Sequence, residues 1–259
     1  MTDVLKSVKK IFTVSVVGAT MSWSVGVSAL LPMVASASLC PTLAAGDMVK
    51  VSGKAAIYSV DKMNKILYFP SGDEFKSWNE NNSYGGYVTI TQGCFDSLAV
   101  PSAYPGAVNY RPGSYIVKRP SSDQLYVVLP GNKLSKISPA DAALLYGASY
   151  KVMTVADAFW PHYTLRGSDI AGMVHEGMLV SNAGKTWLVD AGNVLREVTA
   201  TGMTANRYKA AFVHTVPASA LVGTSVGSPI SAMESVLTNR TQDGAISSPT
   251  PVVGGSLSV

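Results

Sequence analysis

The stretch Gly46-Asp-Met-Val-Lys-Val51 decides the fold, because altered copies of it occur later as Gly113-Ser-Tyr-Ile-Val-Lys118 and Gly177-Met-Leu-Val-Ser181. The three opening glycines stand 67 and 64 residues apart. A nearly constant period of this length indicates repeated structural units, each of which buries only part of its apolar surface when alone. The sequence therefore predicts three tandem repeats of about 65 residues.

Each opening is followed by two further extended runs that are separated by turns. The first of these runs carries an aromatic residue in every repeat, and both runs have the composition of short strands. Gly and Asn in the intervening turns supply the positive φ that tight hairpins require. The predicted second strands are residues 56–60, 124–128 and 186–190, and the predicted third strands are residues 66–69, 134–137 and 194–198.

A short helix and a closing strand complete each repeat. Ser71 and Ser138 suit helix N-caps, Pro139 suits the first helical position, and Gly147 suits a helix end. The sequence thus predicts a mainly β fold with short helices (α+β), in which each repeat has the order strand, strand, strand, helix, strand. The predicted helices are residues 71–78, 138–146 and 199–208, and the predicted closing strands are residues 88–90, 152–155 and 213–216.

The first 37 residues have the pattern of an export signal. Three lysines within the first ten residues precede an uncharged, largely apolar run at residues 11–34, and Ala35-Ser-Ala37 supplies the small residues of a cleavage site. We expect the mature chain to begin at Ser38 and to lie at the cell surface or outside the cell. A retained membrane anchor is the alternative, because the uncharged run is long enough to span a bilayer.

The remainder of the chain divides into the repeats and a tail. Arg111-Pro-Gly113 has the composition of a turn that joins two units. The tail is rich in Ser, Thr, Pro and Gly and predicts a linker, which leads either to a further domain or to a frayed end. The predicted bounds are 38–110, 111–174 and 175–222 for the repeats and 223–259 for the linker.

The two cysteines predict a disulfide. Cys40 and Cys94 are the only cysteines, and an exported protein meets an oxidising compartment. A bridge between them would tie the start of the mature chain to the first repeat. The alternative is that they are two unrelated small apolar residues.

The charge of the chain argues against a nucleic-acid partner. Charged residues make up only 14%, and the formal net charge is +4, whereas soluble domains have roughly 25% charged residues. Three of the basic residues lie in the predicted export signal. No basic stripe is left in the repeats, and such a stripe is the usual mark of nucleic-acid binding.

One pattern typical of serine hydrolases is present. Gly223-Thr-Ser-Val-Gly227 matches G-x-S-x-G around Ser225, and His162 or His214 would have to serve as its base. The motif lies at the start of the predicted linker and lacks the flanking strand and helix that lift such a serine above a sheet. We therefore predict no catalytic residue and keep a secreted hydrolase as the weakest alternative.

The sequence contains no recognisable metal motif. It has three histidines, and His175-Glu176 lacks a second histidine at helical spacing. Asp73 and Glu74 are adjacent and suit the first turn of a helix better than a carboxylate pair. We expect no cofactor, and calcium is kept as a candidate assembly ion although no calcium-loop motif occurs.

Aromatic residues at repeated positions are the candidate ligand contacts. Aromatic rings beside Asn and Asp can stack on sugars or anchor a protein interface. The alternative is that they form the cores of units that contain little Leu and Phe. The candidates are Tyr58, Tyr68, Trp78, Tyr126, Tyr146, Trp160 and Trp187.

Several strings together resemble a known repeat region. It is found in large exported proteins of uncultivated, small-genome bacteria, some of which are similar to surface-layer proteins. The resemblance covers residues 46–222, is weakest in the third repeat, and implies a surface location without any catalytic residue. The strings are Ala56-Ile-Tyr-Ser-Val60, Leu67-Tyr-Phe-Pro70, Phe75-Lys-Ser-Trp78, Tyr110-Arg-Pro-Gly113, Leu144-Leu-Tyr-Gly147 and Val155-Ala-Asp-Ala-Phe159.

These observations favour a non-enzymatic, surface-layer-like structural protein of the cell envelope that associates with itself through its repeats. The alternative is a module of a larger surface protein that binds a glycan or the cell wall through the repeated aromatic residues.

Overall fold

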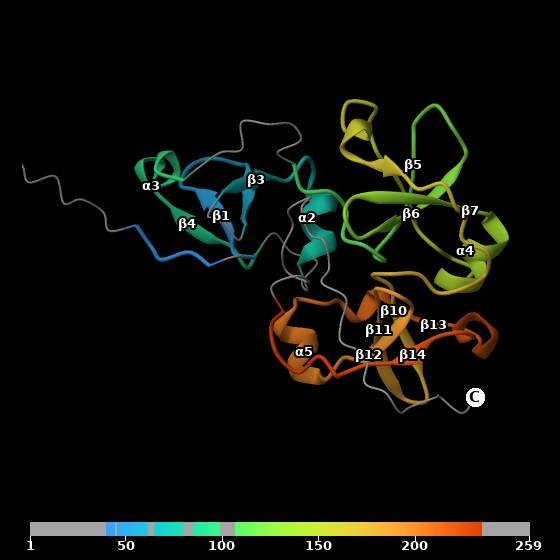
Figure 1. The fold of residues 1–259 in the computed structure, drawn as a ribbon. Coiled ribbons are helices and arrows are strands. Elements are labelled where there is room, and N and C mark those ends of the chain that lie inside the picture. Colours follow the sequence, from blue (N-terminus) through green and yellow to red (C-terminus); the bar gives the residue numbers. More distant parts are fainter. Residues whose placement is uncertain (1–39, 45, 62–64, 80–84, 99–106, 235–259) are drawn as a thin grey trace, which may run out of the picture. The chain divides into compact units, whose positions relative to one another are not determined.

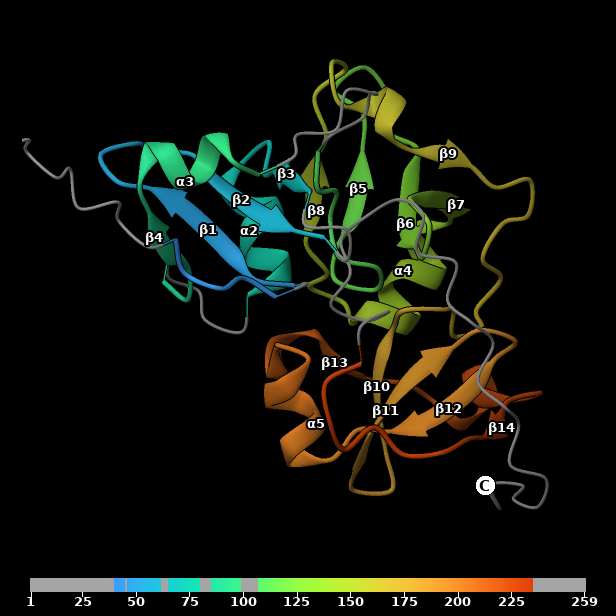
Figure 2. The ribbon, with the colours of Figure 1, turned by 60° about the vertical axis from the view of Figure 1, so that its left-hand side comes forward.

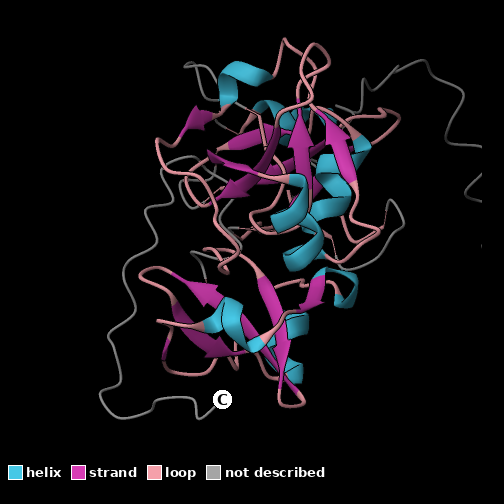
Figure 3. Cartoon of the chain, turned by 90° about the vertical axis from the view of Figure 1, so that its right-hand side faces the viewer, coloured by secondary structure: helices cyan, strands magenta, loops and turns pink. Residues whose placement is uncertain are grey.

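The described part of the chain folds into three small β-sheets with few and short helices. The computed structural model describes residues 40–44, 46–61, 65–79, 85–98 and 107–234. Figure 1 shows the three sheets in successive colour ranges, and Figure 3 shows that strands and loops dominate over helices. The predicted fold class, mainly β with short helices, is confirmed.

The first sheet has four strands in the order β3-β2-β1-β4 (Figure 2). Ser71 caps α2 by accepting a hydrogen bond from the backbone N–H of Asp73, as its sequence position predicts. The elements are β1 (Met48–Val51), β2 (Ile57–Val60), β3 (Ile66–Tyr68), α2 (Gly72–Trp78), β4 (Val88–Ile90) and α3 (Gln92–Asp96).

The second sheet has five strands in the order β8-β5-β6-β7-β9. Ser138 caps α4, Pro139 occupies its first turn, and Gly147 ends it with φ 86°, so the predicted helix bounds are confirmed. The elements are β5 (Ile116–Lys118), β6 (Leu125–Leu129), β7 (Lys133–Ile137), α4 (Pro139–Tyr146), β8 (Val152–Thr154), η1 (Trp160–His162) and β9 (Thr164–Leu165).

The third sheet has five strands in the order β13-β10-β11-β12-β14. Its helix is shorter than the predicted residues 199–208, because the chain leaves the helix at Asn206 and Arg207 takes a positive φ. The elements are β10 (Leu179–Asn182), β11 (Lys185–Asp190), β12 (Val194–Glu197), α5 (Ala200–Ala205), η2 (Ala210–Phe212), β13 (Val213–Thr215), η3 (Ala218–Leu221) and β14 (Ser225–Val226).

All three sheets have the same pattern of strand pairing. The first three strands of each form an antiparallel meander, and the strand after the helix pairs in parallel with the first strand. A short helical turn follows, and the chain then returns to pair in parallel with the third strand. In the first sheet this last pairing is a single bridge between Tyr68 and Ala107.

Each sheet has two unlike faces. The helix face is the one covered by α2, α4 or α5, and the opposite face is covered by the short helical turn that follows the parallel strand. In the first sheet Met48 lies on the helix face with Phe75 of α2, and Val49 lies on the opposite face with Cys94 of α3. This division follows from the alternation of side chains along a strand.

The second and third sheets share one apolar core. The helix face of the second sheet, with Ile116 and Leu145, packs against the opposite face of the third sheet, with Val180 and Leu195. The described residues all belong to a single compact unit. The main core therefore lies between two sheets that contribute unlike faces.

Residues 223–234 correct the predicted boundary of the linker. β14 pairs with β12, Ile230 forms a bridge with Val198, and Ile230 is fully buried. Composition alone suggested a linker here, but parallel pairing uses backbone groups that Ser and Gly also provide. The predicted export signal at residues 1–37 and the rest of the predicted linker, residues 235–259, lie outside the described residues.

Candidate functional site

Four of the seven candidate aromatic residues lie in the cores of the sheets. Trp78, Tyr126, Tyr146 and Trp187 are only 6–8% exposed. Their side chains share sheet faces with aliphatic residues, and Tyr146 also lines a pocket between the second and third sheets. This burial agrees with the packing alternative, and a role of these four residues in ligand binding stays a prediction.

The other three candidate aromatic residues are partly buried. The ring of Tyr58 lies 4.8 Å from that of Phe95, and the ring of Trp160 lies 5.3 Å from that of Tyr126. Tyr68 ends the edge strand β3. The seven residues are thus distributed over three sheets, and the fold does not bring them together into one site.

The predicted disulfide is present. Cys40 and Cys94 are bonded, with their Cα atoms 5.4 Å apart. Cys94 is buried on the opposite face of the first sheet, beside Val49 and Val51. The bond therefore holds residue 40 against the opposite face of the first sheet. In the third sheet, the corresponding face is covered by the second sheet.

The structure does not assemble a catalytic site around Ser225. Ser225 lies in β14 and His214 in β13, which form opposite edges of the third sheet with three strands between them. His162 lies in η1 beside the second sheet. The strand order of the third sheet thus holds His214 away from Ser225, and His162 belongs to an element outside that sheet.

Arg111 is the residue that joins the three sheets. Its guanidinium donates hydrogen bonds of 2.8 Å to the carbonyl oxygens of Asn206 and Arg207, which follow α5. The same group lies 5.1 Å from the ring of Trp78 in α2 and 4.1 Å from the ring of Tyr208. Arg111 is 5% exposed, and this burial lowers the pKa of its guanidinium.

Further polar contacts continue this junction between the first and second sheets. The indole N–H of Trp78 donates to the carbonyl oxygen of Asn109, and the Asn109 side chain donates to the carbonyl oxygen of His162. The backbone N–H of Arg111 donates to the Ser77 hydroxyl. Because these buried groups have hydrogen-bond partners, the junction avoids the cost of unpaired polar atoms.

A second polar cluster lies between the second and third sheets. The hydroxyl of Tyr146 in α4 lies 2.7 Å from Nε2 of His175, and Nδ1 of His175 lies 3.1 Å from the carbonyl oxygen of Glu176. Since a carbonyl only accepts, Nδ1 carries the proton and Nε2 accepts from Tyr146. Burial, with a smaller contribution from the nearby His214, lowers the pKa of His175 to about 4.

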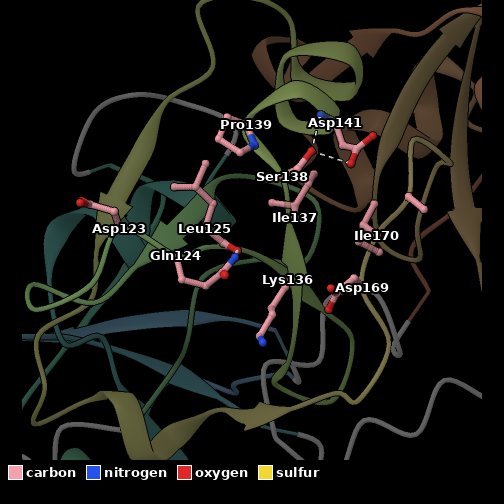
Figure 4. A pocket seen from close by; sticks show the side chains of 11 residues that line it. Asp123, Gln124, Leu125, Lys136, Ile137, Ser138, Pro139, Asp141, Asp169 and Ile170 are labelled. Carbon is pink, nitrogen blue, oxygen red and sulfur yellow. Dashed lines mark hydrogen bonds between the residues drawn. The ribbon is translucent and has the colours of Figure 1, made fainter.

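A pocket of about 600 Å³ opens on the second sheet, around the start of α4 (Figure 4). The Ser138 hydroxyl donates to Asp141 at 2.7 Å while it caps the helix. Gln124, Lys136 and Asp169 also line the pocket. They offer both donors and acceptors to a polar ligand, but no histidine, cysteine or aromatic residue is among the described residues that line it.

Sequence patterns predicted the disulfide but not the buried polar contacts of Arg111 and His175. Arg111 was predicted as part of a turn that joins units, and its position between Tyr and Pro-Gly gave no sign of its burial. His175, Lys209 and Arg196 are buried charged or titratable residues that periodicity did not single out. His175 and Arg196 each take one partner from far along the chain, Tyr146 and Glu234 respectively, so only the folded structure identifies these contacts.

The described part of the chain offers neither a metal cluster nor a membrane span. Within the described ranges, His, Cys, Asp and Glu form no group of three or more that is suited to hold a metal ion. No helix in those ranges combines the length and the apolar character that crossing a bilayer requires.

Comparisons with known proteins give slight structural likenesses. No protein-family model matches the chain, and no curated protein matches it. A chain of the periplasmic assembly from the ESX-5 inner membrane complex is similar over 75% of this chain and 70% of its own, with 11% identity and a TM-score of 0.20. A chain of an intact ESX-5 inner membrane complex is similar over 89% and 60%, with 12% identity and a TM-score of 0.18.

Proposed function

We propose that this chain is an exported, non-enzymatic protein of the cell envelope, built from three tandem repeats, that acts structurally by self-association. The observation that carries this proposal is the packing of unlike faces in the shared core, where Leu145 of α4 meets Val180 and Leu195 of the third sheet. Units that bury a helix face against an opposite face are suited to pack on further copies of themselves.

The sheet edges supply a second reason. Leu165 lies in the edge strand β9 and is 56% exposed. An edge strand presents unpaired backbone groups, and an apolar side chain on it favours pairing with another chain. The disulfide between Cys40 and Cys94 fits an oxidising location such as the cell surface.

Sedimentation velocity over a wide range of protein concentrations tests this proposal. We expect the protein without residues 1–37 to sediment faster as concentration rises, and negative-stain images to contain regular assemblies. Samples with and without calcium show whether a divalent cation promotes the contact. A monomer at every concentration in both series would overturn the proposal.

A pair of variants identifies the surface involved. Leu165→Lys places a charge on β9 and should shift association to higher concentration. Val222→Lys makes a similar change at a residue that is 64% exposed in the turn before β14, and it should leave association unchanged. Equal effects of the two variants would rule out β9 as the contact.

A further inference from the structure

A pocket of about 410 Å³ lies where the second and third sheets meet. The second sheet contributes Tyr115, Ser149, Tyr150 and Lys151, and the third contributes Lys209 and His214. The volume falls within the range of roughly 300–1,000 Å³ that is typical of small-molecule sites. The described residues that line this pocket include two lysines and no aspartate or glutamate.

The two lysines give this pocket a positive charge. Nζ of Lys209 lies 5.2 Å from the centre of the Phe212 ring, and Nζ of Lys151 lies 5.4 Å from the centre of the Tyr115 ring. Lys209 is 4% exposed. Burial lowers the pKa of Lys209, and the positive charges of Lys76 and Lys151 lower it further. An acidic group in the pocket would be attracted by the positive charges of both lysines, and charged hydrogen bonds are stronger than neutral ones.

His214 adds a neutral polar group to the same wall. Its Nε2 atom is buried and has no hydrogen-bond partner among the described residues. Burial lowers the pKa of His214, so the imidazole is neutral at pH 7. A buried ring nitrogen without a partner calls for a polar group that the protein itself does not supply. The hydroxyls of Ser149 and Tyr150 can take part in the same polar contacts.

We propose that this pocket binds a sugar residue that carries a carboxylate or a phosphate group. Lys151 and Lys209 would bind the acidic group, while Tyr150 and Ser149 would contact the ring and its hydroxyls. Tyrosine suits this role because its ring packs on the apolar face of a sugar and its hydroxyl bonds to a polar one. The proposal does not depend on self-association, because the pocket lies within one chain.

Isothermal titration calorimetry with three sugars of the same ring tests the proposal. The probes are glucuronic acid, glucose 6-phosphate and glucose, with inorganic phosphate as a fourth probe. We expect at least one of the two acidic sugars to bind at least about tenfold more tightly than glucose, which lacks the charged group, and than inorganic phosphate, which lacks the sugar ring. Comparison of the two acidic sugars tells a carboxylate from a phosphate preference.

Two outcomes with these probes would overturn the proposal. If glucose binds as tightly as both acidic sugars, the lysines do not contribute to binding. Inorganic phosphate that binds as tightly as both acidic sugars removes the role of the sugar ring and leaves a simple anion site. Sedimentation of the same samples reports separately on self-association, so the two proposals can fail independently.

Matched lysine variants locate the site. Lys151 is exposed, so Lys151→Gln should fold normally and weaken binding of the acidic sugar about tenfold. Lys54→Gln removes the same charge from the exposed turn between β1 and β2 and should leave binding unchanged. In two-dimensional amide NMR spectra, the ligand should shift the signals of residues 211–214. Equal affinities of the two variants would place the site elsewhere and overturn the assignment.

Discussion

The side chain of Arg111 contacts residues of both the first and the third sheet. A guanidinium offers a planar fork of donors and a face that stacks on aromatic rings, and Arg111 uses both properties at once. A lysine in its place retains the charge but not the fork. The carbonyl oxygens of Asn206 and Arg207 would then compete for one ammonium group in a buried site.

We therefore expect Arg111→Lys to lower the free energy of unfolding by about 2 kcal/mol, since a buried acceptor is left without a donor. Arg119→Lys is the matched control, because Arg119 also bonds to a partner, Asp157, and lies over Trp160, but both charged groups are exposed. That control should cost less than about 1 kcal/mol. Urea denaturation followed by tryptophan fluorescence measures both changes, and equal losses would contradict the role assigned to Arg111.

His175 makes stability depend on pH. Its pKa in the folded chain is about 4, against 6.5 without burial, so the unfolded chain takes up a proton at a higher pH than the folded chain does. The contribution of His175 to the free energy of unfolding is thus fully present above pH 6.5. It is lost as the pH falls from about 6.5 to about 4, and it amounts to on the order of 3 kcal/mol. His175→Gln can retain both hydrogen bonds but does not titrate, so its melting temperature should fall less between pH 7 and pH 4.5. Parallel falls would contradict this assignment.

At the scale of elements, helix caps, tight turns and short strands could be predicted from the sequence, because they depend on neighbouring residues. Ser71 and Ser138 cap helices where expected, and Asn132 and Asn193 take positive φ in the predicted turns. The short strands were also predicted, because apolar runs between such turns leave few alternatives. Local patterns could not predict β14, since its pairing with β12 depends on backbone groups rather than on side-chain type.

The contact between the second and third sheets depends on two glycines from the repeated opening. A methyl group added to Gly113 would overlap the carbonyl oxygen of Gly177, and one added to Gly177 would overlap Cβ of Pro112. Both glycines also have positive φ. The close approach of the two openings therefore tolerates no side chain at either position.

We expect Gly113→Ala to lower the free energy of unfolding by more than about 3 kcal/mol, because backbone strain and overlap add. Gly184→Ala is the control, since Gly184 has φ 76° but no atom within 4 Å of an added Cβ. It should cost only about 1–2 kcal/mol, the penalty of the backbone conformation alone. Chemical denaturation measures the free energy of unfolding of both variants. Similar losses would mean that the close approach of Gly113 to Gly177 does not contribute to stability.

At the scale of the whole molecule, the three sheets are joined by contacts that the sequence did not reveal. Arg111 and Asn206 lie 95 residues apart in the chain, and Asn109 and His162 lie 53 apart. Buried polar partners at such distances leave no periodic signal. The candidate pocket beside Lys209 was missed for the same reason, because its two lysines come from different sheets.

Each sheet has its own tryptophan reporter, namely Trp78, Trp160 and Trp187 for the first, second and third. In variants that keep one of these and replace all other tryptophans by phenylalanine, we expect the three reporters to unfold at the same urea concentration while the disulfide is intact. With a reductant, the Trp78 transition should move to lower urea, because the bond stabilises by about 4 kcal/mol in the loop-entropy account. A Trp78 transition that does not move would mean that the first sheet is held by its neighbours alone.

The disulfide also sets the route that mechanical tension takes through the chain. All four strands of the first sheet, residues 48–90, lie between Cys40 and Cys94. A pull along the backbone from residue 39 therefore passes from Cys40 directly to Cys94 through the covalent bond. The first sheet is shielded from that load, and the force is borne first by the connection from Cys94 to the junction at Arg111.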